Sequence, residues 1–397
     1  MLDVLRNLPA YQALLRQLKA GELLPGLGLL RSARLPVCAA LHYDLNQPIV
    51  LVTDRPQHAL TLLDELGFWA KDAPRYYFTE PTPLFYEQAA WGTSTRRDRL
   101  QALTALAIYH LQGVAKPELA PIIITTVRAI MTRTLPRRDF IKTSRTIKLH
   151  QSLPPNDLIR SWLDIGYQPA DIVLEPGQFS RRGGILDVWP PAEPLPVRLE
   201  FFGDEIDLLR RFDPASQRTV ARLDQLLVTP ARELLPGRAE GLLPPGQEVD
   251  EFNIPLVHPA VASLLDYLPR NAITLIDDVS LLQSLAVEIE EQAVRLRSES
   301  IAEGTLSEDY PTPYLSWSEL LDSLTGHTWL ELGHGSEVEI SELANDFKPG
   351  PRFGGRLRQL VEYIEEFCSR GESCWVVSRQ VSRLQELWGE RQGEICQ

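Results

Sequence analysis

The sequence predicts an α/β fold in which a small α+β domain is inserted into a parallel-sheet domain. Short apolar runs rich in β-branched residues are typical of parallel strands buried on both faces. Amphipathic segments with helical spacing lie between them and would cover such a sheet. Another stretch, punctuated by Gly and Pro, has alternating polarity and stands between parallel-type strands, which indicates an insertion. The apolar runs are residues 48–53, 121–126, 272–277 and 374–378.

The predicted insertion is antiparallel sheet over about residues 166–228. Val197, Leu199 and Phe201 would lie on one face of a strand, and Arg198, Glu200 and Phe202 on the other, because strand side chains alternate. After the run at 272–277, Leu281, Leu285 and Ile289 recur at helical spacing and predict an amphipathic helix. Residues 240–259 have no clear period and predict a loop.

Length and charge limit the class of protein. A chain of 397 residues with 44% hydrophobic residues is typical of two or three compact domains. The formal net charge of −13 argues against a stand-alone nucleic-acid binder, which needs a basic face, so we expect a protein partner. No apolar run could span a bilayer and residues 1–6 do not resemble a signal peptide, which predicts a cytoplasmic protein without a membrane partner. The cysteines show no paired spacing, so no zinc site or disulfide is predicted.

Residues 28–35 (GLLRSARL) stand where a phosphate-binding loop would be expected, ahead of a helix and the run at 48–53. Such a loop ends in Gly, Lys and Ser or Thr. Counting from Gly28, the chain has Ala33, Arg34 and Leu35 at these three positions. Leucine has no hydroxyl for magnesium, and arginine is a poor substitute for the compact lysine ammonium. We therefore expect a degenerate loop without an ATP or magnesium cofactor.

Asp277 is the last residue of the third apolar run and Asp278 follows it, at the place where an ATPase would hold magnesium. We expect them to be solvated carboxylates beside a helix start, with Ser280 as a possible cap. The sequence thus predicts no catalytic residue and no metal site. The alternative is a divergent ATP-dependent DNA-damage factor that binds nucleotide through Arg34 and Asp277.

Residues 177–218 carry the most specific motif. They read GQFSRRGGILDVWPPAEPLPVRLEFFGDEIDLLRRFDPASQR. This run closely resembles the UvrA-binding domain shared by UvrB and the transcription-repair coupling factor (Mfd) family. Segments resembling the Mfd family follow in the same order at residues 125–136, 263–272, 310–320 and 351–364. UvrB is the nearest alternative, but it needs an intact G-K-T loop and a long DNA-clamping hairpin, and neither is found.

The resemblance implies a domain layout, a function and partners. A degenerate P-loop (RecA-like) domain would cover residues 1–126 and 229–348, the inserted UvrA-binding domain 127–228, and a further α/β domain would begin at 349–397 and continue beyond it. The implied function is recruitment of UvrA in transcription-coupled nucleotide excision repair, without an ATPase in this segment. RNA polymerase and double-stranded DNA would bind through other domains of the family. The family's UvrA-contacting positions correspond to Arg182, Arg198 and Phe202.

The residues themselves leave alternatives open at this site. An exposed phenylalanine beside an arginine is typical of an interface hot spot, but Phe202 could equally pack under a loop while the arginines pair with Glu200, Asp204 or Glu205. Gly183 and Gly184 leave the side of Arg182 undetermined. Asp187 is expected to cap or pair within the fold. The basic segment 127–148 is expected to be a solvated connector, with nucleic-acid contact as the alternative.

Overall fold

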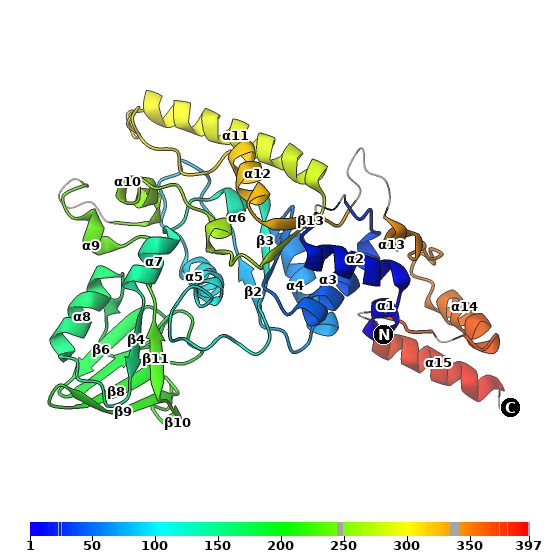
Figure 1. Cartoon of the computed structure of the whole chain (residues 1–397), viewed down its shortest axis with the longest axis horizontal. Coiled ribbons are helices and arrows are strands. Elements are labelled where there is room, and N and C mark those ends of the chain that lie inside the picture. Colours follow the sequence, from blue (N-terminus) through cyan, green and yellow to red (C-terminus); the bar gives the residue numbers. More distant parts are fainter. Residues whose placement is uncertain are drawn as a thin grey trace.

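The computed structural model describes residues 1–22, 24, 26–243, 249–333, 341–372, 374–378 and 380–395. Its two main units are a parallel-sheet unit and an inserted sheet unit, the latter at the lower left of Figure 1. Among the described residues, no helix is both long and apolar enough to cross a membrane. The same part of the chain holds no group of three side chains placed to bind a metal ion.

The parallel sheet has the strand order β13-β12-β1-β3-β2, and every neighbouring pair is parallel. The predicted strands at 48–53, 121–126 and 272–277 are confirmed. Because β12 follows the inserted unit in the chain yet pairs directly with β1, the insertion is confirmed as well. The strands are β1 (Ile49–Thr53), β2 (Arg75–Phe78), β3 (Ile122–Thr126), β12 (Ile273–Ile276) and β13 (Thr328–Glu331).

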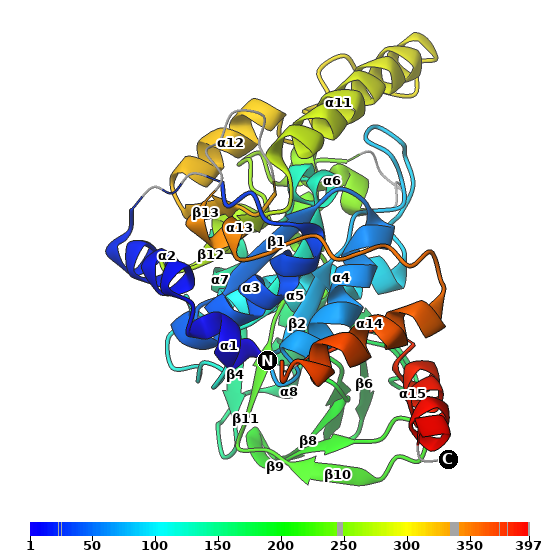
Figure 2. The ribbon, with the colours of Figure 1, turned by 90° about the vertical axis from the view of Figure 1, so that its right-hand side faces the viewer.

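Both faces of this sheet are covered by helices. On β1, Val50 and Val52 belong to one apolar cluster, whereas Ile49 and Leu51 belong to the other. The second cluster contains residues of α3 (Arg31–Leu45) and α4 (Pro56–Trp69), and the first contains residues of α5 (Thr93–Ala107), α11 (Val279–Ala302) and α12 (Trp317–Thr325). In Figure 2 α3 and α4 lie in front of the strands. The predicted helix after the third run is confirmed as α11. At the N-terminus lie α1 (Leu2–Arg6) and α2 (Pro9–Ala20).

The inserted unit has a six-stranded sheet of order β10-β9-β8-β7-β6-β5, antiparallel except for β5 with β6. Its buried face packs on Trp162 of α8 (Pro155–Asp164), so the small α+β prediction is confirmed. The strands β4 (Arg145–Lys148) and β11 (Gln225–Val228) pair with each other, and through them the chain enters and leaves the six-stranded sheet. We call this pair the neck. The six strands are β5 (Gln168–Pro169), β6 (Gln178–Arg182), β7 (Ile185–Val188), β8 (Val197–Phe202), β9 (Glu205–Phe212) and β10 (Thr219–Arg222).

The predicted strand at 374–378 is wrong. These residues form no strand and have no pairing partner among the described residues, and Trp375 is 55% exposed. An apolar run becomes a strand only where its amide and carbonyl groups find a ladder. The described part of 349–397 therefore consists of α14 (Leu357–Ser369) and α15 (Val381–Ile395), without the expected α/β start. A short helix, α13 (Glu342–Asn345), precedes them.

The basic segment 127–148 is not simply a solvated connector. Arg133 is buried and donates to the carbonyl oxygens of Thr312, His258 and Pro259. Arg128 bonds Glu80 and two proline carbonyls. These two arginines satisfy backbone carbonyl oxygens and so belong to the packed interior. Arg128 lies within α6 (Val127–Met131) and Arg133 just after it, ahead of α7 (Arg137–Thr143). The remaining exposed cations of the segment are Arg138, Lys142, Arg145 and Lys148.

The expected loop at 240–259 is only partly a loop. Residues 244–248 lie outside the described part. After them, the chain forms a short 3-10 helix, η1 (Glu251–Asn253), and α10 (Ile254–Val257), and α9 (Pro236–Ala239) precedes the segment. Ser263 caps a second 3-10 helix, η2 (Leu264–Tyr267), ahead of β12.

Candidate protein-binding face and degenerate nucleotide loop

The two faces of β8 differ as the alternation predicts. Val197 and Leu199 are buried against the core, and Phe201 packs against it. Phe202 lies on the opposite face and is 84% exposed. It ends β8, where Gly203 (φ 63°) turns the chain into β9. The alternative in which Phe202 packs under a loop is therefore wrong, since its ring is open to solvent.

Asp187 is the centre of this open face. Its carboxylate is buried and accepts two hydrogen bonds from Arg198, Nε to Oδ1 at 2.7 Å and Nη2 to Oδ2 at 2.8 Å. Arg182 Nη2 donates to the same Oδ2 at 2.9 Å. The expectation that Asp187 pairs within the fold is confirmed, and the strand register places Arg182 on the same side as Asp187. The three groups form one charge-assisted network.

Arg198 is less available than the alternation alone suggests. Only 11% of its side chain is exposed, and its guanidinium stacks 4.4 Å from the centre of the Phe212 ring. Nη2 also donates to Gln217 Oε1 at 2.8 Å. The hydrogen bond to Asp187 raises the pKa of Arg198, so the side chain is firmly cationic. Arg182, in contrast, keeps 51% of its side chain exposed.

The alternative in which these arginines pair with Glu200, Asp204 or Glu205 is wrong, because both bond Asp187. Glu200 pairs with Arg210 of β9, and Glu205 lies near His150. Sequence alternation could not single out Asp187 or Gln217, because one faces Arg198 from β7 and the other comes from the turn after β9. Gly184 fits the hairpin between β6 and β7 tightly, since a Cβ there would lie 3.3 Å from the Phe201 carbonyl oxygen.

The loop that begins at Gly28 uses its amides within the protein. The backbone N–H groups of Leu27, Gly28 and Leu29 donate to the carbonyl oxygens of Glu331, Gly333 and Leu332, at 2.8, 3.1 and 2.7 Å. A phosphate-binding loop needs such amides free to point at the ligand. The amides of Gly28 and Leu29 are instead committed to Gly333 and Leu332, and the amide of Leu27, just before the loop, is bonded to Glu331 of β13. The helix α3 then starts at Arg31, and Ala33, Arg34 and Leu35 are all buried in its first two turns.

Arg34 and Asp277 are brought together by this arrangement. Arg34 Nη1 lies 2.6 Å from Asp277 Oδ1, and Nε donates to the Leu29 carbonyl oxygen. Thr53 Oγ1 donates to Asp277 Oδ2 at 3.3 Å. Asp277 is therefore a buried partner of Arg34, which corrects the expectation of a solvated carboxylate.

The expected cap of α11 is also corrected. Asp278 caps the helix by accepting from the Leu281 amide, and Ser280 only donates its hydroxyl to Asp278. Asp277 and Asp278 thus have different structural roles: Asp277 pairs with Arg34 and Asp278 caps α11. Neither is left as a simple solvated carboxylate.

Comparisons with known proteins agree with this architecture. Residues 146–234 match the family model of the UvrB interaction domain. The transcription-repair-coupling factor of Bacillus subtilis (strain 168) is 27% identical over 321 residues, which cover 71% of this chain and 26% of the relative. That of Myxococcus xanthus is 35% identical over 226 residues, 55% of this chain and 18% of the relative. The UvrABC system protein B of Kosmotoga olearia is 30% identical over 114 residues, 29% of this chain and 17% of the relative.

The inserted unit thus places this chain among proteins that contain a UvrB interaction domain. The chain is homologous to transcription-repair-coupling factors, as the motif at residues 177–218 indicated. It spans about a quarter or less of the length of these curated relatives.

Proposed function

We propose that the inserted unit docks UvrA and thereby acts as the recruiting module of a transcription-repair coupling factor in nucleotide excision repair. The match of residues 146–234 to the UvrB interaction domain supports this class of partner. Binding of RNA polymerase and double-stranded DNA belongs, in this proposal, to other parts of the longer relatives. The parallel-sheet unit serves as a rigid, RecA-like support without ATPase activity.

The open face of the six-stranded sheet is the proposed docking surface, and the exposure of Phe202 is the observation that carries it. A largely exposed aromatic ring with a half-exposed arginine on the same face has the composition of an interface hot spot. Phe202 supplies apolar contact area and Arg182 supplies hydrogen bonds to a partner carboxylate. Arg198 acts mainly as a positioning residue, because Asp187, Gln217 and Phe212 enclose its guanidinium.

Isothermal titration of UvrA into this protein tests the proposal. Phe202→Ala should weaken binding by about 2 kcal/mol, which is about 30-fold, while leaving the thermal unfolding temperature unchanged. Phe68→Ala is the matched control, since Phe68 is another exposed phenylalanine and lies in α4 of the parallel-sheet unit. Equal affinity of the wild type and Phe202→Ala would reject the assigned surface, and absence of binding by the wild type would reject UvrA as the partner.

The loop at residues 28–35 is proposed not to bind nucleotide. The amides of Gly28 and Leu29 are bonded to the carbonyl groups that follow β13, and the Arg34–Asp277 ion pair stands where a lysine and a magnesium-binding carboxylate would act. Titration with a fluorescent ATP analogue and magnesium should show no saturation up to millimolar concentrations. Binding at micromolar concentrations would instead support the divergent ATP-dependent enzyme.

A further inference from the structure

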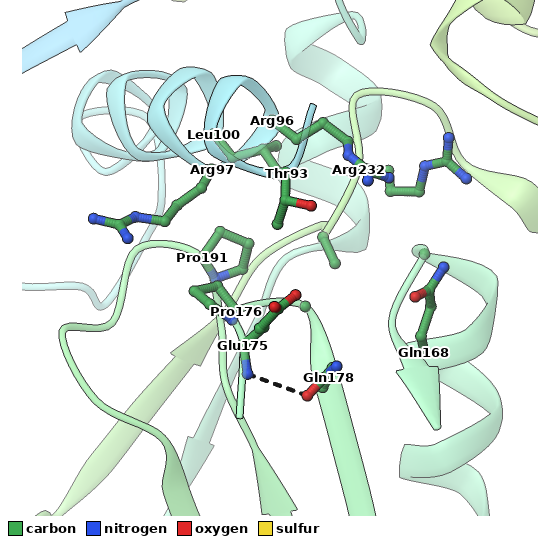
Figure 3. A pocket seen from close by; sticks show the side chains of 13 residues that line it. Thr93, Arg96, Arg97, Leu100, Gln168, Glu175, Pro176, Gln178, Pro191 and Arg232 are labelled. Carbon is green, nitrogen blue, oxygen red and sulfur yellow. Dashed lines mark hydrogen bonds between the residues drawn. The ribbon is translucent and has the colours of Figure 1, made fainter. Parts of the chain in front are cut away.

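The hollows of this molecule differ in what lines them. The one at the start of α5 has a volume of about 60 Å³ and mostly polar walls, and a hydrogen bond from the Glu175 amide to Gln178 Oε1 closes one side of it (Figure 3). A groove of about 410 Å³ between α14 and α15 is instead mostly apolar. Two cysteines, Cys368 and Cys374, are among the residues that line this groove.

Helical spacing directs Cys368 into the groove. Val361, Ile364 and Cys368 follow one another at intervals of three and four positions, so they lie on one face of α14. All three line the groove, as do Leu384 and Trp388 of α15, which lies beside α14 (Figures 1 and 2). Cys368 occupies the last turn of α14 and its side chain is exposed.

A defined turn ends α14 just after Cys368. Gly371 has a left-handed conformation (φ 79°), and its amide donates to the Cys368 carbonyl oxygen at 3.0 Å. The amide of Glu372 donates to the Phe367 carbonyl oxygen at 3.2 Å. These two bonds form a Schellman motif, which closes the last carbonyl groups of a helix. The direction in which the chain leaves α14 is thereby fixed two positions before Cys374.

Beyond this turn, Cys374 meets the groove from the other side. Cys374 and Val376 both line it, whereas Val377 lines a different hollow beside Phe68 of α4. Burial and the neighbouring Cys368 thiol raise the pKa of Cys374, as expected for two thiols that lie close together. A helix and the segment after it thus direct one thiol each into the same hollow, and both thiols are free and exposed.

We propose that Cys368 and Cys374 are a redox-modification site, at which a low-molecular-weight disulfide of the glutathione class converts the two thiols into a reversible disulfide bond. One cysteine thiolate attacks the reagent disulfide, which forms a mixed disulfide and releases one reagent thiol. The second cysteine thiolate attacks the protein-bound sulfur and releases the other reagent thiol. The two protons of the protein thiols pass to the released thiolates. Two protein thiols are oxidised, and one reagent disulfide is reduced to two thiols.

The bond would join the end of α14 to residues 374–378, which pair with no strand in the part of the chain that the structure describes. Exposed disulfides are the labile kind that serve regulation rather than permanent stability. The spacing of the cysteines did not predict this bond, because the turn at Gly371 and the shared groove bring the pair together. Oxidation should therefore restrain the segment, and reduction should release it.

Oxidation of the reduced protein by glutathione disulfide, followed by peptide mass mapping, tests this proposal. Trypsin cleaves after Arg370, between the two cysteines, so the bond should appear as a linked pair of peptides. Thiol titration in denaturant should show the loss of two free thiols, and treatment with dithiothreitol should restore both. Cys368→Ser and Cys374→Ser should each abolish the linked peptides and leave the remaining cysteine as a mixed disulfide with glutathione.

Cys396→Ser is the matched control and should yield the same linked peptides as the wild type, although Cys396 lies outside the described residues. Separate attachment of glutathione to Cys368 and Cys374 in the wild type would overturn the proposal. Absence of thiol loss, or a bond from either cysteine to Cys396, would overturn it as well. Mapping of the wild type decides the question even if a serine variant fails to fold, and no result depends on UvrA binding.

Discussion

Arg198 and Asp187 face each other across β7 and β8 and are joined by two hydrogen bonds of 2.7 and 2.8 Å. Both side chains are nearly enclosed, although they lie on the open face of the sheet. The pair therefore fixes the shape of that face and leaves Phe202 and Arg182 as the exposed groups of the proposed docking surface. Loss of binding in an Arg198 variant would then have two causes, a lost contact and a distorted surface.

The first prediction separates these causes by stability. Arg198→Ala leaves the buried Asp187 carboxylate without its main partner, so it should lower the free energy of unfolding by about 3 kcal/mol. Arg198→Lys should cost less, because charge is kept and only the bidentate geometry is lost. Phe202→Ala should change stability by less than about 0.5 kcal/mol. Urea denaturation measures all three, and similar losses for Arg198→Ala and Phe202→Ala would contradict the positioning role.

Gln217 gives the second prediction, because it holds a left-handed backbone conformation (φ 60°) in the turn after β9. Its side chain accepts from Arg198 and donates to the Pro214 carbonyl oxygen. Gln217→Ala loses these bonds and keeps the strain, whereas Gln217→Gly loses the bonds and relieves it. The free energy of unfolding of the alanine variant should therefore be about 1 kcal/mol lower than that of the glycine variant. In urea denaturation, the alanine variant should unfold at the lower urea concentration. The opposite order would show that the turn rearranges on losing its side chain.

The sequence predicted the buried centre of the parallel sheet but not its edges. β1, β3 and β12 are flanked by strands on both sides and read as continuous apolar runs. β2 and β13 are the edge strands, and residues such as Arg75 and Thr328 break the apolar pattern there. The run at 374–378 has the strand composition but no partner. Composition therefore reports burial on both faces, whereas strand formation also requires a neighbour to pair with.

At the site, the sequence predicted which face Phe202 occupies but not how deep Arg198 lies. Alternation gives the side of a strand, whereas depth depends on contacts from other strands and turns, here Asp187 and Gln217. Likewise the loss of the lysine and hydroxyl at positions 34 and 35 could be seen directly. That Arg34 would bond Asp277, 243 positions away, required the strand order of the folded sheet.

The third prediction concerns restoration of the loop motif. Ala33→Gly, Arg34→Lys and Leu35→Thr together recreate G-x-x-x-x-G-K-T. The triple variant should still fail to bind ATP and magnesium at micromolar concentrations, because the amides of Gly28 and Leu29 remain bonded to the residues after β13. It should also lose stability, since Leu35 is buried and threonine places a hydroxyl in its site. Micromolar affinity in a titration with labelled ATP would show that side chains alone inactivate the loop.

The fourth prediction is that the buried His258 makes the free energy of unfolding depend on pH. The imidazole is fully buried, and its Nε2 accepts from the Leu235 amide. Burial lowers the pKa of His258 to about 4, below the value of 6.5 expected for the unfolded chain. The unfolded state therefore binds a proton more readily, and stability should fall as pH decreases from about 6.5 toward 4, by up to about 3 kcal/mol.

Urea denaturation at several pH values checks this dependence. His258→Gln should be less stable at pH 7 but should lack this part of the decline. The same slope in wild type and variant would assign the acid sensitivity to other groups. Asp139, which lies 3.5 Å from His258 Nδ1, is the carboxylate to examine in that case.

The last prediction concerns coupling between the two units through Arg99 and Glu233. Arg99 of α5 lies between the rings of Phe78 and Trp91, and its Nε and Nη2 donate to the Glu233 carboxylate at 2.6 and 2.9 Å. Both side chains are completely buried, and Glu233 follows β11 of the neck. Glu233→Gln leaves the guanidinium charge uncompensated, so it should cost about 3 kcal/mol or more.

Because this pair ties the returning chain to α5, its loss should weaken cooperativity as well as stability. Calorimetry should show a single transition for the wild type and a broadened or divided one for Glu233→Gln. Arg238→Ala, which breaks the more exposed pair with Asp139, is the control and should cost less than about 1 kcal/mol. Arg99→Met combined with Glu233→Leu removes both charges and should recover much of the lost stability, as expected for a buried pair whose desolvation offsets its attraction. Recovery of stability without recovery of a single transition would show that the ion pair, rather than packing, couples the two units.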